Sequence, residues 1–130
     1  MKNNNSNTKL IDLNITSSII FIVASIISLI VTLDERNRII NKKTLFNKKE
    51  SLNIAFYNRI VILVSVFISL YVGYNNFKNE KDNTIGKYKS SLLLTTNILT
   101  VISGFIILYV AYLNRNEQTL DLDIVENPLV

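Results

Sequence analysis

The sequence contains no cysteine, no histidine and no tryptophan, and it has only three glycines and one proline. Without cysteine there can be no disulfide bond, thiol chemistry or thiolate metal ligand. Without histidine the chain lacks the commonest general base and the usual ligand of haem and zinc. Three glycines are too few for a phosphate-binding loop. These absences predict a protein that is not an enzyme and has no catalytic residue, bound metal or cofactor.

Charge is missing from three long stretches. Residues 13–33 and 91–113 contain no Asp, Glu, Lys or Arg, and the apolar run 60–74 extends to Phe77 through two asparagines. A helix of about 20 residues spans the roughly 30 Å hydrocarbon core of a bilayer, so these runs predict three transmembrane helices. We therefore expect an all-α integral membrane protein, a small bundle of three spanning helices. A soluble bundle with three buried helices is the alternative.

The charge pattern divides this single domain into seven segments. In order, these are a polar N-terminal tail (1–12), span 13–33, a charged and partly amphipathic loop (34–58), span 59–77, a short polar loop (78–90), span 91–113 and an acidic C-terminal tail (114–130). Ser51 suits a helix N-cap, so the second helix can begin near residue 52. The short second loop predicts that the second and third helices form an antiparallel hairpin. The alternation of apolar and acidic residues over 120–124 predicts either a short strand or a disordered tail.

The first loop mixes basic residues with the apolar residues Ile39, Ile40, Leu45 and Phe46. This mixture has two interpretations. Short amphipathic helices can lie at the lipid headgroups, where the basic side chains meet phosphates, or the segment can be a solvated charged loop.

All six tyrosines lie near the proposed ends of the spans. Tyrosine is favoured there because its ring is apolar and its hydroxyl needs water or a headgroup. The expected interface belt consists of Tyr57, Tyr71, Tyr74, Tyr88, Tyr109 and Tyr112.

Each span also carries small or hydroxyl residues at fourfold spacing, which places them on one helix face where another helix can approach closely. Asn97 is the one strongly polar side chain well inside the third span, and it can hydrogen-bond a neighbouring helix or line a narrow aqueous path. The candidate packing residues are Ala24, Ser28 and Thr32 in the first span, Ser65, Ser69 and Gly73 in the second, and Thr96, Asn97, Thr100 and Gly104 in the third.

Ionisable groups at bilayer depth mark transport and intramembrane catalysis, and the spans contain none. We therefore expect a non-enzymatic protein that acts through helix packing, as an accessory or scaffold subunit or as a homo-oligomer. The expected partners are the lipid bilayer and another membrane protein or a second copy. The net charge of +4 is spread over two loops and predicts no nucleic-acid partner, and no small-molecule ligand is indicated.

A pore is the alternative function. The short chain, the weakly charged N-terminus and the three spans broadly resemble a three-span holin, which implies lesion formation by an oligomer. The acidic tail and the long charged first loop depart from that pattern. A small oligomeric channel, lined by the hydroxyl residues and Asn97, is the third possibility.

The basic residues also suggest an orientation. Eight of the 14 Lys and Arg lie in the first loop region and the C-terminal tail, and six lie in the N-terminal tail and second loop. The positive-inside rule then predicts an N-terminus outside and a C-terminus in the cytoplasm. So small a bias also leaves dual topology open.

Overall fold

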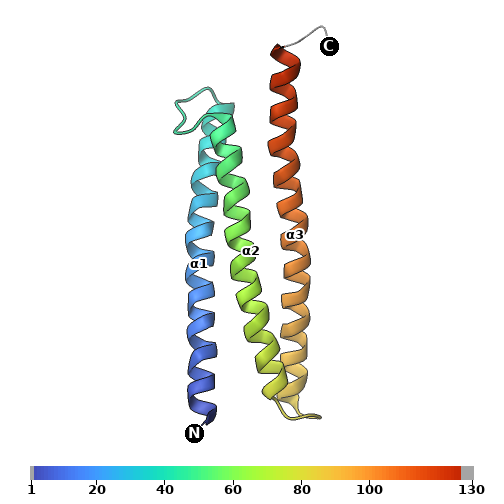
Figure 1. Ribbon diagram of the computed structural model, residues 1–130. Helices are drawn as coiled ribbons and strands as arrows, with labels where there is room; N and C mark the ends of the chain where they lie inside the picture. Colours follow the sequence, from blue (N-terminus) through green and yellow to red (C-terminus); the bar gives the residue numbers. More distant parts are fainter. Residues whose placement is uncertain (1, 127–130) are drawn as a thin grey trace.

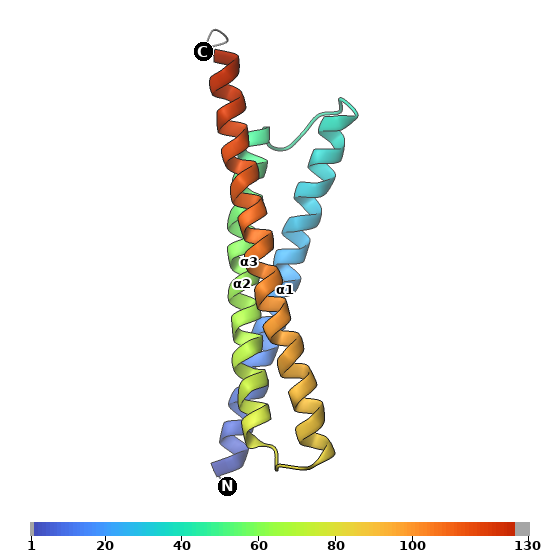
Figure 2. The same ribbon diagram turned by 90° about the vertical axis from the view of Figure 1, so that its right-hand side faces the viewer.

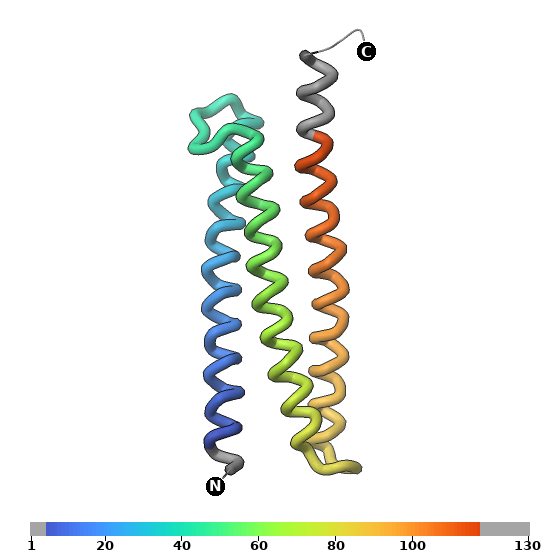
Figure 3. Tube along the Cα trace, viewed as in Figure 1, coloured from blue at the N-terminus to red at the C-terminus, as the bar shows by residue number. Residues whose placement is uncertain are grey.

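The protein consists of three long helices, as a computed structural model shows. The structure describes residues 2–126, with side chains for residues 5–117 (Figure 3). The helices are α1 (Lys2–Ile39), α2 (Lys48–Asn79) and α3 (Ile85–Glu126). Each contains one of the three charge-free runs, and each is long and apolar enough to cross a membrane. The prediction of an all-helical protein with three such helices is therefore confirmed.

The helices extend well beyond the apolar runs. α1 begins at Lys2, so most of the expected N-terminal tail is helical, and α3 continues to Glu126 through most of the expected C-terminal tail. The predicted strand over 120–124 is wrong, because those residues belong to α3. No proline interrupts either helix, and extending an existing helix costs far less than starting one. Residues 127–130 of the expected tail lie outside the described part of the chain.

The loop between α1 and α2 is shorter than expected because α2 begins before Ser51. The N-cap is Asn47, whose side chain accepts from the Glu50 amide at 2.8 Å, while the Glu50 side chain accepts from the Asn47 amide. This reciprocal arrangement is a capping box. The prediction of Ser51 as the N-cap is therefore wrong. Asn41 and Asn83, one near each turn, have positive φ, which asparagine tolerates better than most residues.

α2 is the central helix. It packs against both α1 and α3, whereas the backbones of α1 and α3 do not approach each other closely within residues 2–126. Figure 1 shows α2 between the other two helices. In the view turned by 90° in Figure 2, the axes of α1 and α3 are inclined to each other and cross in projection. The molecule is therefore an open layer of helices rather than a closed bundle.

The contact faces of the outer helices follow a heptad spacing, with steps of three and four residues in turn. Such spacing keeps one face of a helix against its neighbour. In α1 the buried and half-buried positions at this spacing are Leu10, Leu13, Ser17, Ile20, Ala24, Ile27, Val31, Asp34 and Arg38. In α3 they are Ser90, Leu94, Asn97, Val101, Gly104, Leu108, Ala111 and Arg115.

Candidate functional site

Three serines join α1 to α2 near the middle of the layer. The Ser17 hydroxyl lies 2.8 Å from the backbone oxygen of Ser65, 3.1 Å from its hydroxyl and 2.8 Å from the hydroxyl of Ser69. In return, the Ser65 hydroxyl donates to the backbone oxygen of Ser17 at 2.9 Å. Ser17 and Ser65 are both buried. The two helices therefore exchange hydrogen bonds through side chains that are buried between them.

Two asparagines extend this polar contact. Nδ2 of Asn58 donates to the backbone oxygen of Ala24 at 2.9 Å, and Nδ2 of Asn97 on α3 donates to the backbone oxygen of Ser69 at 3.2 Å. Ser69 thus contacts α1 through its hydroxyl and α3 through its carbonyl. We call Ser17, Asn58, Ser65, Ser69 and Asn97 the polar seam. Oδ1 of Asn58 is buried and has no hydrogen-bond partner among the described residues.

A small hollow opens beside the polar seam, where all three helices contribute side chains. Its volume is about 300 Å³. Most of the residues around it carry hydroxyl or amide groups, and Phe21, Ile22 and Val66 complete the wall. The polar lining residues are Ser17, Ser18, Ser65, Ser69, Asn97 and Thr100.

At one end of the layer a buried carboxylate fixes the α1–α2 loop. The side chain of Asp34 is 1% exposed and accepts from the amides of Leu45 at 2.5 Å and Phe46 at 3.2 Å. Arg38 forms ion pairs with Asp34 and Glu35 and donates to the Phe46 carbonyl at 2.7 Å. Because a buried charge is costly unless it is paired and hydrogen-bonded, these partners explain why Asp34 can be buried.

At the opposite end a lysine closes the turn between α2 and α3. Nζ of Lys87 donates to the Phe77 carbonyl at 2.8 Å, lies 3.8 Å from the centre of the Phe77 ring and is 3.6 Å from Oδ1 of Asp82. The last carbonyls of a helix have no partner within the helix, so a cation there stabilises the end of α2.

The structure separates the predicted packing residues into two groups. In α1, Ala24 is fully buried and Ser28 half-buried, but Thr32 is exposed. In α3, Thr96 and Thr100 are exposed and their hydroxyls bond the backbone of their own helix. The buried or half-buried group consists of Ala24, Ser28, Ser65, Ser69, Gly73, Asn97 and Gly104, and the exposed group of Thr32, Thr96 and Thr100.

Both predicted glycines lie where helices approach closely. A Cβ at Gly73 would collide with Nδ2 of Asn97, and one at Gly104 would lie 2.8 Å from Cδ1 of Leu63. The six tyrosines, by contrast, are all exposed. Tyr112 also packs its ring against Phe56, with centroids 6.4 Å apart.

The fourfold spacing of small residues did not predict a role for Ser17, Asn58 or Asp34. A sevenfold spacing could have found the first two, because Ser51, Asn58 and Ser65 are seven residues apart and all buried, as are Ser17 and Ala24. Asp34 adjoins the charge-free run, and no spacing distinguishes it from the charged residues that follow.

Within residues 5–117 no three acidic side chains gather closely enough to hold a metal ion. Comparisons with protein-family models, curated proteins and solved structures found no match.

Proposed function

We propose that the chain is an integral membrane protein whose three helices span the bilayer, with α2 and α3 forming an antiparallel hairpin. The distribution of side chains supports this. Buried polar residues are at least as numerous as buried apolar ones, whereas large apolar side chains are exposed along all three helices. A protein in water has the reverse arrangement, because burial of apolar surface drives its folding. Hydrocarbon around the helices accounts for an apolar exterior.

The function that we propose is to hold helices together, either as an accessory or scaffold subunit or as a homo-oligomer, without catalysis. The observation that carries this proposal is the polar seam. Hydroxyl and amide groups at span depth are used in bonds between helices, and in hydrocarbon such bonds and close packing hold helices together.

α3 is the helix that best suits contact with another chain. Its inward face meets α2, while Thr96 is exposed on a different face and its hydroxyl bonds the backbone one turn earlier. A face of this kind lets a second helix approach without leaving a polar group unsatisfied. The partner is a second copy of the chain or another membrane protein.

A matched pair of threonine variants tests this function. Thr96→Leu adds bulk on the proposed contact face, whereas Thr95→Leu makes the same change about 100° round the helix, at 3.6 residues per turn. Both threonines are exposed, and both hydroxyls bond their own helix. Native mass spectrometry of tagged protein, extracted from its host membrane in mild detergent, should show an oligomer or a co-purifying partner that Thr96→Leu weakens and Thr95→Leu leaves intact. A monomer without partners, or equal effects of both variants, would contradict the proposal.

The hollow favours a pore as the second candidate function. Its hydroxyl and amide lining lies within the charge-free runs, at a depth where polar surface can conduct water or ions once several copies assemble. Release of a trapped dye from liposomes that contain the purified protein distinguishes the two functions. Release that Ser69→Leu abolishes supports the pore, and intact liposomes support the packing role.

A further inference from the structure

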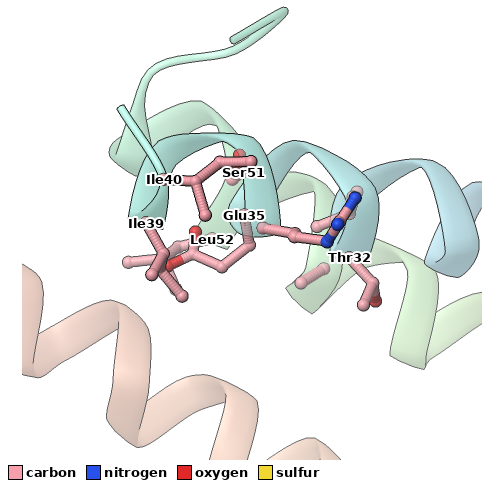
Figure 4. A pocket seen from close by; sticks show the side chains of 9 residues that line it. Thr32, Glu35, Ile39, Ile40, Ser51 and Leu52 are labelled. Atoms are coloured by element: carbon pink, nitrogen blue, oxygen red, sulfur yellow. The ribbon is translucent and has the colours of Figure 1, made fainter. Parts of the chain in front are cut away.

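A second hollow lies between the end of α1 and the beginning of α2. Its volume is about 450 Å³, within the range of roughly 300–1,000 Å³ that ligand pockets have. In Figure 4 the side chains of Ile39, Ile40 and Leu52 lie close together, and Thr32 and Glu35 lie farther along α1. The apolar residues that line this groove are Val31, Ile39, Ile40, Leu52 and Ala55, and the polar ones are Thr32, Glu35, Arg36 and Ser51.

The groove crosses the boundary between the apolar and the charged parts of the chain. Val31 belongs to the charge-free run, whereas Arg36 lies beyond its end, and the lining of α1 from Val31 to Ile39 is about 12 Å long at 1.5 Å per residue. In the proposed bilayer the groove therefore begins among acyl chains and ends among headgroups. Ile39 is 73% exposed there and adds its side chain to the apolar lining of the groove.

The charges around the groove are unbalanced. Between residues 34 and 50 every carboxylate has a partner within the chain, because Asp34 and Glu35 pair with Arg38 and Glu50 belongs to the capping box. Five basic side chains in the same stretch form no ion pair within the described residues. They are Arg36, Lys42, Lys43, Lys48 and Lys49. The stretch from residue 34 to residue 50 therefore complements an anion.

We propose that the groove binds an anionic phospholipid, with an acyl chain along Val31, Leu52 and Ala55 and the phosphate beside Arg36. A phospholipid presents apolar and anionic groups in the same order as the groove presents apolar and cationic ones. Clusters of basic residues at the membrane surface are the usual binding sites of anionic lipids. The proposal rests on the membrane insertion proposed above and names a ligand for this end of the protein.

Native mass spectrometry of delipidated protein in mild nonionic detergent tests this site. The probes are phosphatidylglycerol and phosphatidylcholine with identical acyl chains, added in equal amounts. We expect preferential retention of phosphatidylglycerol. Arg36→Gln should lower that retention about fivefold, since one basic side chain near an anionic surface contributes about 1 kcal/mol. Ala55→Phe, which fills the groove, should abolish it, and Lys89→Gln, a change at an exposed lysine at the opposite end, should leave it unchanged.

Circular dichroism of each variant first establishes that the helices are intact, and Arg36→Gln keeps the test valid if Ala55→Phe fails to fold. Equal retention of both lipids, or equal effects of Arg36→Gln and Lys89→Gln, would overturn the lipid site. So would a dimer that Ala55→Phe dissociates without loss of lipid, because a second copy would then occupy the groove. Protein that needs detergent for extraction but shows no lipid preference overturns this proposal alone, whereas protein that is soluble without detergent overturns membrane insertion as well.

Discussion

At the scale of single residues, Ser17 and Ser18 are adjacent in sequence but have different partners. The Ser17 hydroxyl contacts three oxygens of α2, whereas the Ser18 hydroxyl donates to the backbone oxygen of Asn14 in its own helix at 2.9 Å. Ser17 is buried and Ser18 is exposed. The pair therefore separates the contribution of hydrogen bonds between helices from the effect of removing any serine hydroxyl from α1.

Ser17→Ala should destabilise the protein by about 1–2 kcal/mol, because single interhelical hydrogen bonds in membrane proteins average about 0.6 kcal/mol and reach about 1.7. Ser18→Ala should change stability by less than about 0.5 kcal/mol, as exposed substitutions usually do. Unfolding of the purified protein by titration with sodium dodecyl sulfate, followed by circular dichroism, measures both effects. If the two variants unfold at the same detergent fraction, the polar seam does not stabilise the α1–α2 contact.

At the scale of helices and loops, the sequence predicted the number and class of elements but not their ends. Charge-free runs identify the central part of each helix, because charges are costly in an apolar environment. They do not indicate the residue at which a helix ends. The ends depend on weaker local effects. The chain from Lys2 to Asp12 contains no proline or glycine to stop α1, and Asn47 with Glu50 forms a better cap than Ser51. The Asn-x-x-Glu pattern was visible in the sequence and would have placed the start of α2 correctly.

The contact faces were less predictable than the elements. Ser65, Ser69 and Gly73 of α2 follow a fourfold spacing and are all buried or half-buried. In α1 and α3 residues at fourfold spacing turn gradually away from the contact face, so that Thr32 and Thr100 are exposed. Over long distances neighbouring helices stay in contact through steps of three and four residues in turn. Because the spans are apolar on all sides, their sequence does not indicate which face of α2 meets α1 and which meets α3.

The loop between α1 and α2 depends on the carboxylate of Asp34. In Asp34→Asn one acceptor oxygen becomes an amide donor, so the amide of Leu45 or Phe46 loses its partner. Hydrogen bonds to charged groups contribute about 1.5–3 kcal/mol, and we therefore expect these amides to exchange with deuterium at least about tenfold faster. Glu35→Gln is the control, because Glu35 is more exposed and its carboxylate pairs with Arg38 and with no other side chain among the described residues. Unchanged exchange in Asp34→Asn would show that other contacts hold the loop.

At the scale of the whole molecule, the central position of α2 leaves most of the surface of α1 and α3 to the surroundings. The two ends of the layer also differ. One end carries the 40–47 loop, in and beside which five basic side chains form no ion pair within the described residues, and the other carries the start of α1 and the 80–84 turn (Figure 1). The first loop region and the C-terminal part of the chain together hold eight of the 14 lysines and arginines, and this small excess predicts that their end of the layer lies in the cytoplasm. Positive charge of this kind retains a loop in the cytoplasm.

A chain without cysteine allows this orientation to be tested with single cysteine substitutions. Leu45 is 76% exposed at one end and Ile85 is 73% exposed at the other, so Leu45→Cys and Ile85→Cys place accessible thiols at both ends without changing any charge. In intact cells a membrane-impermeant maleimide should label Ile85→Cys and spare Leu45→Cys, and permeabilisation should expose both. Labelling of Leu45→Cys alone would mean that the chain inserts in the opposite orientation. Partial labelling of both would mean dual topology, in which the basic loop is too weak a signal to choose one side.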